Sequence, residues 1–296
     1  MSSISRAAAL VIAGLTLLAA PAAAKAAVVS NGSFETADLS GWLTDDSSGF
    51  WTVYSAGSVI AVTVAAPPLG NHAAVAVQES VPSREILYQD VTLPPRRFRV
   101  QLSLFAFYQA HAPLVSPESL DLGGANEQYR IDVMRPGAPL DSVASGDVLA
   151  TLFRTQTGGA SFLGATRAAA DLSGYAGQTV RLRFAVAATE GALNGGVDVV
   201  GVTGLDLGKA KLNRDRGTAR LPVTVTDAGA IKLSGKAVKR RSVHVPAGTT
   251  KLRVQPKGSA LRHLNARGSA KLKAKVTYRI GAAIQTATMK LKLRKG

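Results

Sequence analysis

The sequence predicts an all-β chain folded as two β-sandwiches, the second smaller than the first. Short segments in which apolar and polar residues alternate recur between residues 98 and 294, and turn-forming residues separate them. Charged and aromatic residues divide sharply between the two halves of the chain. The 296 residues include no cysteine, so ordinary hydrophobic cores, without any disulfide, must stabilise the fold.

The first 26 residues are typical of a secretory signal peptide. Arg6 precedes a long apolar run, and Ala24 and Ala26 place small residues at the two positions that a signal peptidase reads. We therefore expect the segment to be cleaved, leaving a secreted protein, extracellular or associated with the cell surface, without a transmembrane segment. An uncleaved membrane anchor is the alternative.

Alternation with a period of two indicates strands, because successive side chains of a strand point to opposite faces of a sheet. The segments of the first half are 98–108, 128–134, 147–153 and 179–187. Those of the second half are 219–225, 230–235, 251–256, 271–280 and 287–294. After the signal peptide no segment has a convincing helical pattern, so we expect no helix there.

The charge distribution marks the boundary between two modules. Residues 28–207 carry 17 acidic and 10 basic side chains, a net charge of −7, and fifteen of the aromatic residues. Residues 208–296 carry 2 acidic and 23 basic side chains, a net charge of +21, and one aromatic residue, Tyr278. This division predicts an N-terminal module over 27–207, a linker over 208–211 and a basic C-terminal module over 212–296.

The stretch VVSNGSFETADLSGW, residues 28–42, opens the predicted N-terminal module. We expect Val28 and Val29 to start an edge strand, Asn31 to begin a turn, Phe34 to point inward and Trp42 to be buried. Four later segments accompany it: LYQDVTLP (87–94), NEQYRIDVM (126–134), DLSGYAGQTVRLRFAVA (171–187) and GGVDVVGVTGLDL (195–207). Together they resemble the galactose-binding-like jelly-roll domains, a family that includes many carbohydrate-binding modules of secreted bacterial proteins. The resemblance implies a jelly-roll β-sandwich over nearly all of 28–207 and a carbohydrate ligand.

The same resemblance implies a structural calcium ion where the first and last strands meet. Its carboxylate ligands would be Glu35 and Asp198, and backbone carbonyls around Asn31 and Ser33 would complete the six to eight oxygens that calcium takes. The alternative is that Glu35 faces solvent and Asp198 makes hydrogen bonds in a turn.

Strand parity identifies a candidate ligand face, because side chains two residues apart share one side of a sheet. Its predicted residues, from three strands, are Arg99, Gln101, Phe105, Phe107, Asn126, Gln128, Arg130, Asp132, Arg181 and Arg183. Planar polar groups beside aromatic rings suit a sugar, which offers hydroxyls and C–H faces. The loop 109–125, with His111, Glu118 and Asp121, is long enough to form one wall of such a site. The alternative is a solvated face with Arg–Asp pairs, in which Phe105 and Phe107 belong to the core.

The basic module has the pattern of the small immunoglobulin-like sandwiches that end many secreted bacterial proteins. Its basic side chains alternate with apolar ones at Lys271, Lys273, Lys275, Lys290, Lys292 and Arg294. We expect these cations to bind a polyanion, such as an anionic envelope polymer or an acidic polysaccharide. The alternative is that lysines protect sheet edges from pairing with other chains. Nucleic acid is a weaker candidate, because the module offers one aromatic residue for stacking and the chain is predicted to be exported.

The sequence contains neither a Gly-x-Ser-x-Gly motif nor a His-Glu-x-x-His motif, and its four histidines are scattered. We therefore predict no catalytic residues. The function that follows is a secreted, non-catalytic carbohydrate-binding protein, tethered to an anionic cell envelope or matrix by its basic module. The first alternative is a purely structural or adhesive envelope protein without a small ligand, and the second is an enzyme that acts on polysaccharide.

Overall fold

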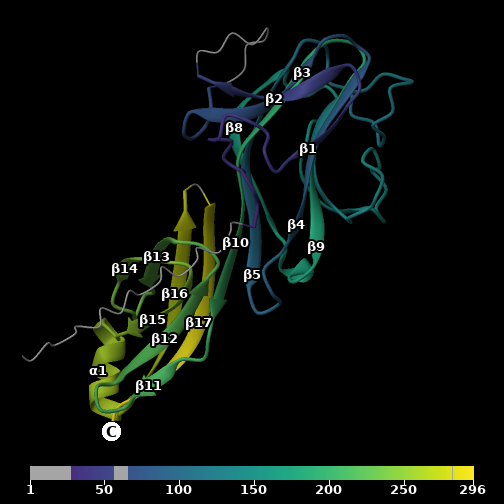
Figure 1. The fold of residues 1–296 in the computed structure, drawn as a ribbon. Helices are drawn as coiled ribbons and strands as arrows, with labels where there is room; N and C mark the ends of the chain where they lie inside the picture. The colour runs from purple at the N-terminus through teal and green to yellow at the C-terminus, as the bar shows by residue number, and fades with distance from the viewer. Residues whose placement is uncertain (1–27, 57–65, 282) are drawn as a thin grey trace, which may run out of the picture.

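The computed structural model describes residues 28–56, 66–281 and 283–296, so the predicted signal peptide lies outside the described residues. Those residues form an all-β fold of antiparallel sheets, which confirms the predicted fold class. Figure 1 shows two lobes, one formed by roughly the first two thirds of the chain and the other by the last third.

The N-terminal lobe is a sandwich of two sheets. Its elements are β1 (Leu43–Asp46), β2 (Gly49–Ser55), β3 (His72–Gln78), β4 (Ser83–Thr92), β5 (Arg99–Ala110), β6 (Glu127–Met134), β7 (Val148–Arg154), β8 (Phe162–Asp171), a 3-10 turn η1 (Ser173–Tyr175), β9 (Thr179–Ala188) and β10 (Leu193–Leu207). One sheet has the order β1-β4-β9-β6-β7, and the other contains β2, β3, β10, β5 and β8. Trp51 and Val197 from the second sheet share a core with Leu87 and Phe184 from the first.

The C-terminal lobe is a smaller sandwich with its own core. Its elements are β11 (Lys211–Asn213), β12 (Thr218–Val225), β13 (Gly229–Ser234), β14 (Arg241–Val245), β15 (Gly248–Val254), α1 (Gly258–Arg267), β16 (Ser269–Ile280) and β17 (Ala283–Arg294). A sheet of order β14-β13-β16-β17 packs on β11, β12 and β15. Leu221 and Val223 of β12 meet Leu272 and Val276 of β16 in this core.

Strand β10 belongs to both lobes, as Figure 1 shows. Near its start, Val197 pairs with Ala74 of β3 and Ala106 of β5. At its end, Leu205–Leu207 pair with Val223–Val225 of β12. Residues 208–210 then lead into β11, so the predicted linker follows a strand that already connects the two lobes.

The structure corrects two local predictions. Residues 28–41 form turns in place of the expected edge strand at Val28 and Val29, and the first strand begins at Leu43. Asn31 and Phe34 adopt left-handed conformations, with φ of 45° and 56°, which an extended strand cannot accommodate. Phe34 is nevertheless fully buried and stacks on the buried Trp42, with ring centroids 5.7 Å apart, as predicted.

The second correction is helix α1, which the sequence interpretation missed. Ala260 and Leu264 lie four residues apart, one turn of a helix, and both are buried against the C-terminal core. Gly268 ends the helix with a φ of 65°, a conformation in which glycine is favoured. The spacing of Ala260 and Leu264, together with Gly268, could have indicated the helix from the sequence. The signal is weak, because these two are the buried residues of the helix.

Candidate functional site

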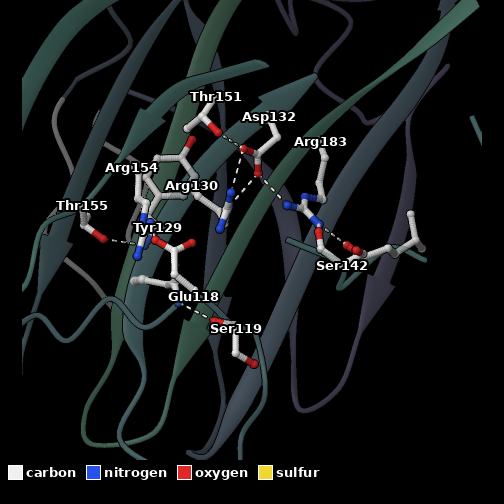
Figure 2. Close-up of polar contacts among 12 residues, drawn as sticks. Glu118, Ser119, Tyr129, Arg130, Asp132, Ser142, Thr151, Arg154, Thr155 and Arg183 are labelled. Carbon is white, nitrogen blue, oxygen red and sulfur yellow. Dashed lines mark hydrogen bonds and ion pairs between the residues drawn. The ribbon is translucent and has the colours of Figure 1, made fainter. Parts of the chain in front are cut away.

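A buried charged cluster lies on the outer face of the first sheet, the side away from the sandwich core. Every residue of β6 is buried, and Asp132 stands at the centre of the cluster. Its carboxylate accepts two hydrogen bonds from Arg130, at 2.7 and 3.0 Å. It also accepts bonds from Arg183 at 2.6 Å and from the Thr151 hydroxyl at 2.7 Å. Figure 2 shows Asp132 between the two guanidinium groups.

The charges in this cluster do not balance. Burial by itself raises the pKa of Asp132, but the hydrogen bond from Arg130 and the positive charge of Arg183 outweigh it, so the pKa lies below its ordinary value. Two arginines share one carboxylate, and the Nη1 of Arg130 has no hydrogen-bond partner among the residues that the structure describes. Arg130 is 3% exposed, so this N–H group is a buried donor available to a ligand.

Residues of the predicted ligand face position two loops that cover the sheet. Arg183 donates to the carbonyl oxygens of Leu140 and Ser142, at 2.6 and 2.7 Å. Gln128 donates to the carbonyl oxygen of Ser119 at 2.6 Å, and Asn126 donates to the same oxygen at 3.0 Å. Asn126, Gln128, Asp132 and Arg183 are thus buried, so the part of the predicted ligand face that they form is covered in this structure.

An open groove remains where the two loops approach each other. It consists of two cavities of about 510 and 460 Å³, and Glu118 and Val143 line both. The larger cavity is also lined by Arg130, Ser145, Val148, Ala150, Thr151, Leu152, Phe153, Arg154 and Gln156. The smaller one is also lined by Ser119, Asp121, Asp141, Ser142 and Ala144. We call these two cavities together the loop groove.

The walls of the loop groove combine carboxylates, hydroxyls and apolar surface. Arg154 holds one wall in place by an ion pair with Glu118 and by hydrogen bonds to the carbonyl oxygens of Ser116 and Pro117. The hydrogen bond and the charge of Arg154 lower the pKa of Glu118, so this carboxylate is ionised. Asp141 on the opposite wall pairs with Arg84 at 3.2 Å. The groove can therefore accept hydrogen bonds at its rim and donate one from Arg130 at its floor.

The remaining predicted ligand residues lie elsewhere. Arg99, Gln101, Phe105 and Phe107 are all on β5, in the other sheet. Phe107 is 1% exposed and packs on Tyr54, so it is a core residue.

Arg181 shares the outer face with the buried cluster. It pairs with Asp90 and lies over the ring of Tyr88, outside the lining of the loop groove. Of the predicted ligand residues, Arg130 lines the groove.

The groove is lined by residues of two loops, of which the sequence interpretation identified one. Glu118 and Asp121 come from the loop that was predicted to form a wall, whereas His111 of that loop is exposed outside the groove lining. Asp141, Ser142 and Val143 come from a second loop, between β6 and β7. Its sequence RPGAPLDSVASGD, residues 135–147, is rich in turn formers and follows a polar strand, and this was the signal available.

Glu35 and Asp198, the predicted calcium ligands, lie within electrostatic reach of each other. Asp198 is fully buried and accepts hydrogen bonds from the backbone N–H groups of Leu69 at 3.2 Å and Val199 at 2.6 Å. Burial, with a further contribution from the charge of Glu35, raises the pKa of Asp198 to about 7. Glu35 is exposed and accepts bonds from the backbone N–H groups of Asn71 and His72.

The rest of the predicted calcium ligand set fits less well. The carbonyl oxygen of Asn31 already accepts bonds from the Trp42 indole at 3.2 Å and from the Phe34 N–H at 3.3 Å, and Ser33 is exposed. Within the described ranges, no group of three or more histidine, aspartate or glutamate side chains converges on a metal site. The two carboxylates suit calcium, but they supply only part of the six to eight oxygens that it takes.

The basic residues of β16 and β17 form a continuous exposed face. Lys271 lies directly opposite Lys292, and Lys273 lies opposite Lys290. These four lysines, with Leu272 and Leu291, line a shallow cavity of about 600 Å³. We call the surface of Lys271, Lys273, Lys275, Lys290, Lys292 and Arg294 the lysine face. All the ion pairs found among the described residues lie in the N-terminal lobe. The lysine face therefore forms no ion pair with a carboxylate among those residues.

Comparison with known proteins identifies similar folds but no family. No protein-family model and no curated protein matches the chain. Among solved structures, the carbohydrate-binding module TmCBM61 in complex with beta-1,4-galactotriose is 15% identical, covering 60% of this chain and 98% of its own, with a TM-score of 0.38.

Two further similar structures belong to larger proteins. The tailspike protein 4 enzymatically active domain of bacteriophage CBA120 is 13% identical over 60% of this chain and 21% of its own, with a TM-score of 0.35. The glycoside hydrolase domain of Endo-D from Streptococcus pneumoniae R6 is 11% identical over 84% of this chain and 36% of its own, with a TM-score of 0.34. With TM-scores below 0.5, these similarities assign the chain neither a family nor a ligand.

Proposed function

We propose that this chain is a secreted, non-catalytic carbohydrate-binding protein whose loop groove binds a neutral saccharide. The observation that carries the proposal is the groove itself, a pair of cavities of about 510 and 460 Å³ with a buried, unpartnered Arg130 N–H at its floor. Sugar hydroxyls both donate and accept hydrogen bonds, so they suit the mixture of Arg130, carboxylates and hydroxyls.

The composition of the rim narrows the class of saccharide. Glu118, Asp121 and Asp141 place three carboxylates around the smaller cavity. An acidic sugar would meet like charges there, whereas a neutral one can donate its hydroxyl protons to them. Val143, Leu152 and Phe153 add the apolar surface that the C–H groups of a sugar ring need.

A glycan array probed with the full chain tests this proposal, with affinities for the array hits then measured by calorimetry. Glu118→Gln and Asp141→Asn should each weaken binding, because a hydrogen bond to a charged group contributes about 1.5–3 kcal/mol. Asp90→Asn is the matched control, since Asp90 also pairs with an arginine on the same sheet but lies outside the groove.

The outcomes separate the alternatives. If the array gives no hits, or if the groove variants and the control bind equally, the groove is not a sugar site and a structural or adhesive role is favoured. If bound oligosaccharides are cleaved on incubation with the chain, the protein is an enzyme acting on polysaccharide.

We further propose that the basic C-terminal module tethers the protein to an anionic envelope polymer or matrix. Like charges directly opposite each other on neighbouring strands destabilise a sheet, and the lysine face contains two such pairs. Edge protection explains lysines on β17, which is an edge strand. It does not explain Lys275 of β16, which pairs with Ser234 on one side and Thr288 on the other.

Salt dependence tests the tether. The full chain should bind an immobilised acidic polysaccharide at low salt and be released at high salt, because the screening length falls from about 10 Å at 0.1 M to about 3 Å at 1 M. Binding that ignores salt, or no binding at low salt, would contradict the tether. In the part of the chain that the structure describes, no helix is long and apolar enough to span a membrane.

A further inference from the structure

The C-terminal sandwich carries exposed cations on both of its outer faces. Leu221 and Val223 of β12 share one core with Leu272 and Ala274 of β16, so the two sheets face each other through these residues. The alternate residues of each strand must then point away from the core. On β16 these are the lysines of the lysine face, and on β12 the corresponding exposed cation is Arg220.

Arg220 belongs to a second basic surface on the opposite side of the sandwich. It lies directly opposite Lys211 of β11 on one side and Arg253 of β15 on the other. Because neighbouring strands lie about 4.8 Å apart, the backbones of these three residues fall within about 10 Å. Lys251, two residues before Arg253 on β15, is also exposed and lies opposite Pro222. We call Lys211, Arg220, Lys251 and Arg253 the second basic face.

Acidic side chains lie outside the second basic face. Asp215 and Asp227 are in turns, and Asp206 of β10 lies opposite Thr224, four residues along β12 from Arg220. Four strand residues span about 13 Å, beyond the range of an ion pair. No ion pair involving these cations occurs among the described residues. Like the lysine face, this surface holds a row of like charges without internal compensation.

We propose that the C-terminal sandwich binds acidic polysaccharide on both outer faces at once, and so cross-links two polymer chains. This inference rests on the proposed tether and adds a second binding surface to it. Packed sheets lie about 10 Å apart, so polymers on the two faces run on opposite sides of the sandwich.

The chemistry of both faces favours a polysaccharide. Threonine hydroxyls lie beside the cations of each face: Thr288 opposite Lys275, and Thr249 two residues from Lys251. Hydroxyls and ammonium groups together match a sugar polymer that carries carboxylates. Tyr278, the aromatic residue of this module, is 1% exposed and offers no platform for stacking bases.

Face-specific variants of the full chain test the proposal, with polygalacturonate as the acidic polysaccharide at about 0.05 M salt, where the screening length exceeds about 10 Å. The lysine-face variant is K271Q/K273Q/K290Q/K292Q, and the second-face variant is K211Q/R220Q/K251Q/R253Q. The control is K236Q/K239Q/K257Q/R262Q, which removes the same charge from exposed positions outside both faces. Titration gives binding stoichiometry, and light scattering reports cross-linking.

The wild type and the control should bind polygalacturonate and raise its scattering at least tenfold, whereas the protein alone should not scatter. Each face variant should still bind, with about half the polymer per protein at saturation, and should lose the rise in scattering. A chain carrying both sets of substitutions should lose binding at least tenfold.

Three results would overturn the inference. A single-face variant that loses all binding would show one binding face, and face variants that scatter like the wild type would show that cross-linking does not use these faces. Tighter binding of duplex DNA than of polygalacturonate at equal salt would replace the polysaccharide as partner. Failure of the wild type to bind at low salt would instead reject the tether itself. This outcome differs from the three above, in which the wild type binds.

Discussion

Arg183 donates a 2.6 Å hydrogen bond to Asp132, and neither side chain has any exposed surface. The same guanidinium group holds the carbonyl oxygens of Leu140 and Ser142, so one arginine joins the buried cluster to the loop that forms a wall of the groove. The side chain of Arg183 therefore contributes both to the position of the loop and to the stability of the sheet.

Replacing Arg183 by methionine should destabilise the fold by about 3–5 kcal/mol, the cost of removing one partner from a buried ion pair. Arg181→Met is the control on the same strand: Arg181 also donates to a loop carbonyl oxygen, that of Ala138, but its pair with Asp90 is partly exposed and should contribute about 0–1 kcal/mol. Urea unfolding measures both. Hydrogen exchange in residues 140–146 should also be faster in the Arg183 variant than in the control, because Arg183 holds the carbonyl oxygens of Leu140 and Ser142. Equal losses of stability in the two variants would mean that the buried pair stabilises the fold no more than the partly exposed pair.

The alternation of apolar and polar residues predicted the strands well, because it is a local property. Residues 271–280, for example, were predicted as a strand with lysines on one side, and β16 spans Ser269–Ile280 with those lysines exposed. The same parity placed Arg130 and Asp132 away from the core. It could not show that loops cover them, since Arg183 and Leu140 are 43 residues apart in sequence.

Two further features depended on contacts between distant segments. Phe105 and Phe107 share a side of β5 with Arg99, yet their strand lies in the other sheet, and Phe107 is covered by Tyr54. The change in charge near residue 208 marks a change of surface. It gave no sign that β10, which ends at Leu207, already pairs with a strand of the second module, because the pairing of Leu205 with Val225 leaves no trace in composition.

A second prediction concerns the packing around two glycines of β10. A Cβ atom on Gly196 would lie 1.9 Å from the ring of Phe107, whereas one on Gly201 would have no heavy atom within 4 Å. Gly196→Ala should therefore cost about 1–3 kcal/mol through overpacking, and Gly201→Ala should change stability by less than about 0.5 kcal/mol. Chemical denaturation of the two variants checks this. A neutral Gly196→Ala would show that Phe107 can move.

Calcium, if it binds at Glu35 and Asp198, should act as a structural ion. The melting temperature should then rise with calcium and fall with a chelator, because a ligand that binds only the folded state stabilises it. Glu35→Gln and Asp198→Asn should each abolish the difference. Asp38→Asn, a change of an exposed carboxylate in the same turn, should preserve it. Coincident wild-type melting curves would remove calcium from this site, and sugar affinity should be the same in either case.

The last prediction concerns pH and rests on a buried carboxyl group of β4. Glu85 has no exposed surface and lies directly opposite Asp46. Gln78 and Ser83 donate hydrogen bonds to one of its oxygens, at 3.0 and 3.3 Å. Burial, with a smaller contribution from the charge of Asp46, raises the pKa of Glu85 to about 7.

Because the pKa is raised in the folded state, the folded chain holds this proton at pH values where the unfolded chain has lost it. The stabilisation by Glu85 is thus complete below the unfolded pKa of about 4.3 and is lost as pH rises through about 7. Asp198, also with a pKa of about 7, contributes in the same direction. The free energy of unfolding should fall between pH 5 and 7 by up to about 1.4 kcal/mol per pH unit for each group.

Urea unfolding of the full chain at pH 5, 6, 7 and 8 measures this slope. Glu85→Gln cannot ionise, so it should reduce the slope, and adding Asp198→Asn should reduce it further. A smaller slope should remain, because burial also raises the pKa of Asp46 and of Glu127. Glu79→Gln, which changes an exposed glutamate in the turn beside Gln78, should leave the slope as in the wild type. A slope in the double variant as steep as in the wild type would mean that other groups govern the pH dependence, because neither substituted side chain can then release a proton.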